Sequence, residues 1–337
     1  MSSGKPMARA TAVLSLAAVL IAAPSTPGQE PPPANGAGVA SDQGTPTQIP
    51  PVFPTDLDLV NVTVSVRDGD GRLIPDLGQG DFVVLEDGRP QAVQVFARAV
   101  QPGDHADLAL DLGLLLDTST SMLKELKLSQ EAAVRFLDAI PRAGELITIF
   151  FDQDIRISRY DSENQQGLFE RIHEAKGGGN TALYDAITVY LSRVAGARGR
   201  KVLVLFSDGE DSTSAMSLSE LLRVVRSSPV TIYSIAFTGG FPTGSSRALK
   251  SRSFLMQVAE MTGGQVFTPS ASRDLAEIYR KILDELAAQY VLGFVSDDPK
   301  RDGKFRRIKV EVKRHGLKVR HRQGYFAPEG QPGVPGS

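Results

Sequence analysis

The stretch that decides the fold is Leu112-Gly113-Leu114-Leu115-Leu116, followed directly by Asp117-Thr118-Ser119-Thr120-Ser121. The apolar run is typical of a strand that is buried on both faces, and the polar run begins where that strand ends. Alternation along an extended chain places Asp117, Ser119 and Ser121 on a common side. One carboxylate and two hydroxyls are hard oxygen ligands, and they suit a hard divalent cation, Mg²⁺ above all.

Two later segments can complete such a ligand set. One is Gly177-Gly178-Gly179-Asn180-Thr181, and the other is Ser207-Asp208-Gly209-Glu210-Asp211, which follows a second apolar run at residues 201–206. Taken singly, each segment is more often a turn, a helix cap or a flexible connection. Their occurrence together, each after the right kind of element, favours a metal site over these ordinary explanations.

The three segments resemble the metal-ion-dependent adhesion site of von Willebrand factor type A domains. That family has an Asp-x-Ser-x-Ser loop, then a Thr in a Gly-rich turn, then an Asp-Gly after a hydrophobic strand. The resemblance covers roughly residues 104–289 and implies as metal ligands Asp117, Ser119, Ser121, Thr181 and Asp208. Asn180 departs from the pattern and leaves open whether Asn180 or Thr181 faces the metal. The helix start that follows, Ala182-Leu183-Tyr184-Asp185-Ala186, favours Thr181.

The resemblance also implies a cofactor and a kind of partner. The cofactor is Mg²⁺, with Mn²⁺ or Ca²⁺ as alternatives. Only two of the five ligands are anionic, and in the family one or both can act through water, so the cation stays electrophilic. A coordination position that remains free can accept a carboxylate from an Asp or Glu of a protein partner. Glu210 and Asp211 add negative field nearby and are candidates for supporting groups around the ligands.

Between residues 104 and 288 the sequence alternates strand and helix patterns, which predicts an α/β fold with a mostly parallel, Rossmann-like sheet and helices on both faces. The predicted strands are residues 108–116, 146–151, 202–206, 230–236 and 265–267, with 154–160 as an antiparallel edge strand. The predicted helices are residues 129–140, 166–174, 182–194, 218–226, 254–261 and 272–287. Ligands of such sheets bind beyond the carboxyl ends of the strands, where all three polar segments lie.

Strand patterns without helices flank this region. Residues 57–100 and 289–327 are each too short to form a stable sandwich, so we expect them to combine into one discontinuous, β-sandwich-like domain. The flanks carry Asp-Phe-x-x-x-Glu-Asp-Gly from Asp81, Tyr-x-Leu-Gly-Phe from Tyr290 and Gly-Tyr-Phe from Gly324. These blocks resemble the flanks of a bacterial exported family of von Willebrand-type proteins. Residues 328–337 are expected to be a disordered tail.

The N-terminal residues predict export. Lys5 and Arg9 precede an apolar run at residues 10–23 that is shorter than the ~20 apolar residues a membrane span needs, and small residues and Pro follow. We therefore expect a signal peptide at 1–25, a Pro/Gly-rich linker at 26–56 and a secreted, periplasmic or cell-envelope location without a lasting transmembrane anchor. A signal anchor is the alternative. The chain has no Cys, which excludes disulfides, thiolate zinc sites and Cys nucleophiles.

Composition and motifs limit the function classes. The 337 residues have a net charge of −2, which argues against nucleic-acid binding. The four His are scattered, and no Gly-x-Ser-x-Gly occurs, so we expect a non-enzymatic protein-binding module for adhesion or complex assembly. One alternative is a metal-assisted hydrolase with Glu210 or Asp211 as base. Another is an envelope scaffold that binds an anionic polymer through a basic C-terminal hairpin, whose Arg and Lys include Arg301, Lys304, Arg306, Arg307, Lys309, Lys313, Arg314, Lys318, Arg320 and Arg322.

Overall fold

The computed structural model describes residues 59–99, 110–140, 145–160, 165–195, 199–237, 244–270 and 272–330. The predicted signal peptide and linker lie outside these residues, as does most of the predicted tail. Contacts between Cα atoms divide the chain into Met1–Phe53 and Pro54–Ser337, and every element described below belongs to the second unit. The domain boundaries expected within that unit stay a prediction. Among the described helices, none is long and apolar enough to cross a bilayer.

A six-stranded sheet positions the polar segments. Its strands, in the spatial order β10-β9-β8-β5-β6-β7, are β5 (Leu110–Asp117), β6 (Leu146–Phe151), β7 (Ile155–Tyr160), β8 (Arg200–Ser207), β9 (Thr231–Ala236) and β10 (Val266–Phe267). All neighbours are parallel except β6 and β7, which pair antiparallel. The predicted parallel sheet with one antiparallel edge strand is thereby confirmed. β5 and β8 are adjacent and buried along their whole length, so their polar exit loops meet at one edge of the sheet.

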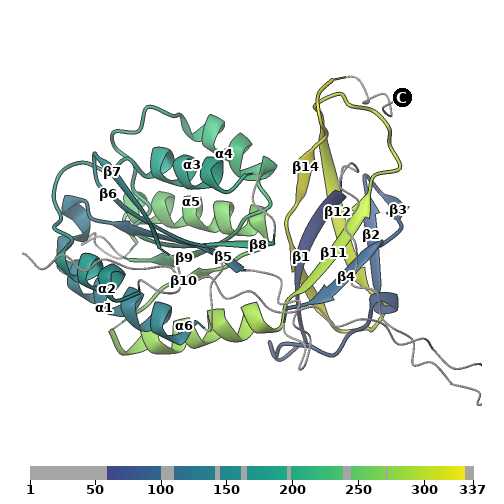
Figure 1. Ribbon diagram of the computed structural model, residues 1–337, viewed down its shortest axis with the longest axis horizontal. Helices are drawn as coiled ribbons and strands as arrows, with labels where there is room; N and C mark the ends of the chain where they lie inside the picture. The colour runs from purple at the N-terminus through teal and green to yellow at the C-terminus, as the bar shows by residue number, and fades with distance from the viewer. Residues whose placement is uncertain are drawn as a thin grey trace, which may run out of the picture. The chain divides into compact units, whose positions relative to one another are not determined.

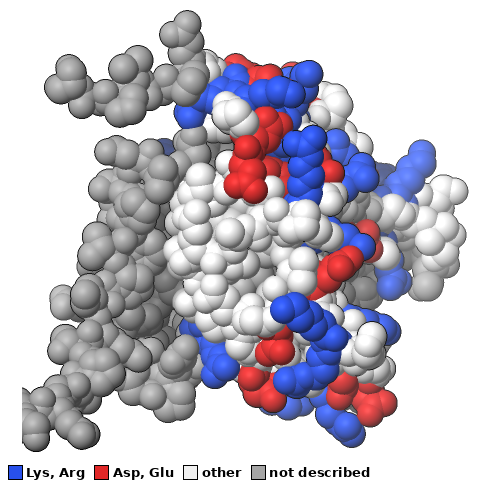
Figure 2. All heavy atoms as spheres, turned by 90° about the vertical axis from the view of Figure 1, so that its right-hand side faces the viewer, with Lys and Arg blue, Asp and Glu red and all other residues white. Residues whose placement is uncertain are grey.

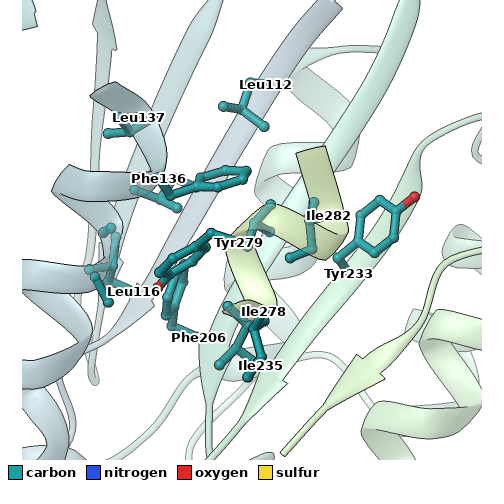
Figure 3. Close-up of a cluster of buried hydrophobic side chains, with 14 of the residues drawn as sticks. Leu112, Leu116, Phe136, Leu137, Phe206, Tyr233, Ile235, Ile278, Tyr279 and Ile282 are labelled. Atoms are coloured by element: carbon teal, nitrogen blue, oxygen red, sulfur yellow. The ribbon is translucent and has the colours of Figure 1, made fainter. Parts of the chain in front are cut away.

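Helices cover both faces of this sheet. They are α1 (Leu123–Ala139), α2 (Gln165–Glu174), α3 (Leu183–Arg193), α4 (Leu218–Ser227), α5 (Ser246–Thr262) and α6 (Ser272–Ala287). α3, α4 and α5 lie on one face, and α1, α2 and α6 lie on the other (Figure 1). Each face has its own apolar core. In the second of these layers the ring of Tyr279 of α6 packs at a tilt against two aromatic rings, with its centroid 5.2 Å from that of Phe136 and 6.2 Å from that of Phe206 (Figure 3).

Two helices begin earlier than the sequence pattern predicts. α1 begins at Leu123 rather than Ser129, because a 3₁₀ turn at Thr120–Met122 leads directly from the polar loop into the helix. Ser129 does not cap a helix; its hydroxyl donates to the carbonyl of Leu126, 2.8 Å away. α5 begins at Ser246 rather than Phe254, since Ser245 accepts a hydrogen bond from the Ala248 amide and caps the added turns.

The remaining strands form two antiparallel sheets. These strands are β1 (Leu59–Arg67), β2 (Phe82–Glu86), β3 (Arg89–Gln91), β4 (Val95–Arg98), β11 (Tyr290–Val295), β12 (Phe305–Val312), β13 (Lys318–His321) and β14 (Gly324–Phe326). The orders are β13-β1-β11-β4 and β14-β12-β2-β3, so each sheet combines strands from both ends of the chain. The predicted pairing of N- and C-terminal strands is confirmed. Alternate residues of both sheets, such as Val62, Leu292 and Ile308, share one apolar core.

Glu285 of α6 joins the helix to strands that are distant in the sequence. Its side chain has no exposed surface and forms ion pairs with Arg67 of β1, at 2.7 Å, and with Arg320 of β13. It also accepts hydrogen bonds from the hydroxyls of Ser65, at 3.0 Å, and Tyr233, at 2.7 Å. Burial raises the pKa of Glu285, but the Arg320 charge and these hydrogen bonds outweigh burial, and the net pKa lies below its ordinary value.

Candidate metal centre

The first polar segment leaves the carboxyl end of β5 with its side chains already hydrogen-bonded. Asp117 is fully buried, and its Oδ1 accepts from the backbone N–H of Ser119, 3.0 Å away. The hydroxyls of Ser119 and Ser121 lie 3.2 Å apart. Extended backbone at Ser119 is consistent with the predicted alternation from Asp117 to Ser119, and the 3₁₀ turn that follows brings the Ser121 hydroxyl beside that of Ser119. The structure therefore brings Asp117, Ser119 and Ser121 together.

The second segment reaches Asp117 from β8. The hydroxyl of Ser207 donates to Oδ2 of Asp117 at 2.7 Å and accepts from the backbone N–H of Gly209 at 2.9 Å. Asp208 is nearly buried; its Oδ1 accepts from the Glu210 amide at 2.9 Å. Its Oδ2 is buried and has no hydrogen-bond partner among the described residues. An unsatisfied buried carboxylate oxygen is costly, and this one lies beside a second acid.

The third segment packs onto the first through its backbone. The Gly178 amide donates to the Thr118 carbonyl at 2.7 Å, and the amide and hydroxyl of Thr120 donate to the Gly179 carbonyl at 3.1 and 2.9 Å. Gly177 has no room for a side chain, because a Cβ there would lie 2.7 Å from the Thr118 carbonyl oxygen. Of the two residues that the sequence left open, Thr181 is buried and Asn180 is exposed. This difference favours Thr181 as the inward-facing ligand.

The site carries more negative charge than its surroundings compensate. Burial, with a smaller contribution from the Asp208 charge, raises the pKa of Asp117 to about 7 against the hydrogen bonds from Ser119 and Ser207. Burial and the Asp208 charge also raise the pKa of Glu125 above its ordinary value, and one of its carboxylate oxygens is buried without a hydrogen-bond partner. In the described ranges, none of these three acids forms an ion pair with a basic side chain.

These residues fit a hard divalent cation. The positive charge that a cation brings would offset the burial of Asp117, and the free Oδ2 of Asp208 offers a donor atom. No group of three or more His, Cys, Asp or Glu side chains in the described part of the chain is arranged to hold a metal. The predicted set combines two carboxylates with hydroxyl oxygens, which hard cations accept as ligands.

Sequence reasoning missed Glu125. The side chain lies within electrostatic reach of Asp208 because α1 begins at Leu123 and places Glu125 in its first turn. The available signal was its spacing of four residues from Ser121, which is one helical turn. That signal becomes visible only if the helix is known to begin directly after the loop.

The two acids proposed as supporting groups are both engaged elsewhere. Glu210 forms an ion pair with Arg247 of α5. Asp211 accepts from the Tyr184 amide at 3.1 Å and from the Ser214 hydroxyl at 2.6 Å, and so ties the loop after β8 to the start of α3. Both carboxylates therefore have partners within the described structure.

The basic C-terminal segment is not uniformly exposed: some of its basic side chains are buried or paired with acids, whereas others, among them Arg307 and Lys318, face solvent. Arg306 and Arg322 are buried, and Arg320 pairs with buried Glu285. Arg306 pairs with Asp298 at 3.3 Å and with Asp302 at 3.0 Å. Figure 2 shows Lys and Arg next to Asp and Glu on the face that it presents.

Comparison with known proteins identifies the α/β region. The model of the von Willebrand factor type A domain matches residues 111–281, which is just over half of the chain. No functionally curated protein is significantly similar in sequence.

Solved structures with a similar fold include three of different origin. A von Willebrand factor type A protein from Catenulispora acidiphila is 14% identical with a TM-score of 0.43, covering 82% of this chain and 75% of that one. The von Willebrand domain of a type V pilus tip protein from Porphyromonas gingivalis is 11% identical with a TM-score of 0.40, covering 52% and 95%. Proximal thread matrix protein 1 from the mussel byssus is 17% identical with a TM-score of 0.42, covering 54% of this chain. The chain spans 48%, less than half, of the mussel protein.

Proposed function

Because the chain belongs to the von Willebrand factor type A domain family, we propose that it is a protein-binding module whose partner docks at a metal-ion-dependent adhesion site. Asp117, Ser119, Ser121, Thr181 and Asp208 would hold Mg²⁺, with Mn²⁺ or Ca²⁺ as substitutes. The bound cation would supply a positive coordination position for an Asp or Glu carboxylate of the partner. The proposed role is adhesion or complex assembly.

One observation supports this proposal best. Asp117 and Asp208 are both buried at the meeting point of β5 and β8, and an oxygen of Asp208 has no partner in the described structure. Uncompensated buried carboxylates are expensive, and proteins keep them where a function requires them. A divalent cation would remove the penalty, while neutral hydroxyls would leave it attractive to one further carboxylate.

The chain's own residues do the positioning. The Ser207 hydroxyl and the Ser119 amide hold the two oxygens of Asp117 in fixed directions. The Gly178 amide and Thr120 fasten the glycine loop to the β5 loop, which fixes the approach of residue 181. A partner would therefore meet loops that are already hydrogen-bonded to one another, which lowers the entropic cost of binding.

We also propose that the protein is exported and is not an enzyme. The positively charged, then apolar N-terminal sequence supports export to the cell envelope or beyond. The engagement of Glu210 with Arg247, and of Asp211 with Ser214, argues against hydrolysis at this site. The pairing of Arg306 and Arg320 with acids likewise weakens the anionic-polymer alternative, since paired guanidinium groups are less available to a polymer.

The test measures Mg²⁺ binding and partner capture with the same variants. We expect titration calorimetry to show Mg²⁺ binding by the wild type, loss of binding in Asp117→Ala and Asp208→Ala, and no change in Asp70→Ala, whose side chain is an exposed turn residue. Capture of envelope proteins on immobilised protein should be retained in Mg²⁺ and lost in chelator. Capture that ignores the chelator, or survives Asp117→Ala, would show that the metal does not mediate recognition.

A further inference from the structure

An ion pair between Asp152 and Arg156 contacts the loop after β5 through the side chain of Thr118. Asp152 follows β6 directly and Arg156 lies in β7, so the pair spans the turn of one hairpin. Nη2 of Arg156 lies 2.7 Å from Oδ2 of Asp152, and Nη1 lies 3.2 Å from Oδ1. This two-pronged geometry fixes the direction of the guanidinium group, which a single contact would not.

The same guanidinium holds Thr118, the residue between Asp117 and Ser119. Nη2 of Arg156 donates to the Thr118 hydroxyl at 2.9 Å, and that hydroxyl lies 3.0 Å from the Phe151 carbonyl. The backbone N–H of Thr118 also donates to the Phe151 carbonyl at 2.8 Å. Alternation directs Thr118 away from the side that carries Asp117 and Ser119. The loop is thus held by its backbone and by the Thr118 side chain, which is not one of the proposed metal ligands.

The pair also reaches the third segment of the site. The carbonyl of Asp152 accepts from the Ala182 amide at 2.8 Å, and Ala182 is the neighbour of Thr181. The Thr118 carbonyl accepts from the Gly178 amide at 2.7 Å. Asp152 and Thr118 therefore connect the β6–β7 hairpin to both the β5 loop and the glycine loop.

From these contacts we infer that Arg156 and Asp152 are positioning residues that set the cation affinity of the candidate metal centre through Thr118 and Ala182. The inference rests on the proposed function, because it concerns the same site. It assigns to the edge hairpin a role that its position at the end of the sheet does not suggest.

The direction in which Mg²⁺ affinity changes when Arg156 is removed distinguishes a positioning role from a purely electrostatic effect. Arg156 is a cation near a site for a cation, so by Coulomb's law its removal alone would tighten Mg²⁺ binding. If Arg156 positions the ligands, its removal weakens binding, because supporting residues of metal sites typically contribute about tenfold or more to affinity. The two explanations predict opposite directions for one substitution.

The experiment compares Arg156→Gln with Arg159→Gln by Mg²⁺ titration calorimetry. Arg159 lies in the same strand and pairs with Glu145 at 3.2 Å, so it is a matched control without a contact to the ligand loops. We expect about tenfold weaker Mg²⁺ binding in Arg156→Gln and also in Thr118→Val, a substitution that leaves the charge unchanged. Arg159→Gln should change Mg²⁺ binding by less than about twofold. Because Arg156→Gln and Thr118→Val break one network, the double variant should be little worse than either single variant.

A second readout needs no metal. Hydrogen exchange in chelator should be faster at the amides of Thr118, Gly178 and Ala182 in Arg156→Gln, and unchanged there in Arg159→Gln. If the wild type binds no Mg²⁺, both the proposed function and this inference fail. If the wild type binds Mg²⁺ and Arg156→Gln binds equally or more tightly, the positioning role alone is overturned. The milder Arg156→Lys keeps the charge without the fork and serves if Arg156→Gln does not fold.

Discussion

Asp117 at the end of β5 and Glu285 on α6 are equally buried acids with opposite surroundings. Glu285 has two arginine partners, Arg67 and Arg320, and its pKa lies below the ordinary value despite burial. Asp117 has neutral hydrogen-bond donors and a neighbouring acid, and its pKa is raised to about 7, chiefly by burial. This chain thus supplies counter-charge where a carboxylate holds the fold together. Around Asp117, where we propose that a cation binds, no basic side chain of the described residues forms an ion pair with the carboxylate.

The largest expected effect is at the paired acid. Glu285→Gln leaves Arg67 and Arg320 without their carboxylate, and breaking a buried ion pair typically costs about 3 kcal/mol. Urea unfolding should show a loss of that size in the free energy of unfolding, in Mg²⁺ and in chelator alike. A loss below about 1 kcal/mol would mean that the ion pairs of Glu285 contribute little to stability, and would contradict the structural role assigned to Glu285.

The same change of acid to amide should act in the opposite direction at the other site. In chelator at pH 8, Asp117→Asn removes a buried charge, so we expect the free energy of unfolding to rise by about 1 kcal/mol. Mg²⁺ should stabilise the wild type and have no effect on the variant, because only the wild type would bind it. Destabilisation by Asp117→Asn in chelator would show that Asp117 is a structural acid like Glu285.

The two acids also predict stability losses in different pH windows. For Asp117 the folded pKa is raised, so between about pH 4 and 7 the folded state holds a proton that the unfolded state has lost, and stability falls as pH rises. For Glu285 the folded pKa is lowered, so its contribution is present above the unfolded pKa and is lost as pH falls through the folded pKa.

Unfolding curves in chelator across pH 3 to 8 would test both signs. Asp117→Asn should flatten the pH dependence of stability in the upper window, and Glu285→Gln should flatten it in the acidic window. A wild-type stability that rises between about pH 4 and 7 in step with Asp117→Asn would contradict the predicted sign for Asp117.

The sequence predicts one side of this comparison far better than the other. Asp117, Ser119 and Ser121 alternate along a short stretch directly after an apolar strand, so local periodicity places them together. The partners of Glu285 could not be predicted in this way. Arg67 lies 218 residues away in the sequence, and its contact depends on how strands from both ends of the chain pair. Periodicity shows that Arg320 alternates in a strand, but not that an acid from a helix meets it.

The sequence also predicts the bounds of the strands better than the start of helix α1. The strands of the parallel sheet are continuous apolar runs, and these were predicted within one or two residues. The start of α1 was placed six residues late, since Ser119 and Ser121 are poor helix formers and hide a helix that begins at Leu123. That error concealed Glu125, whose role depends on lying in the first turn.

Substitution of Glu125, a third acid close to Asp208, should have a smaller effect. Its charge adds to the excess negative field at Asp208, so Glu125→Gln should raise the free energy of unfolding in chelator by about 0.5 kcal/mol. The same substitution should weaken Mg²⁺ binding by about threefold, because one negative charge near the cation is lost. Glu131→Gln, on an exposed position of the same helix, is the matched control and should change neither quantity. If both variants behave alike in calorimetry and urea unfolding, Glu125 is an ordinary helix residue, and the uncompensated charge is confined to Asp117 and Asp208.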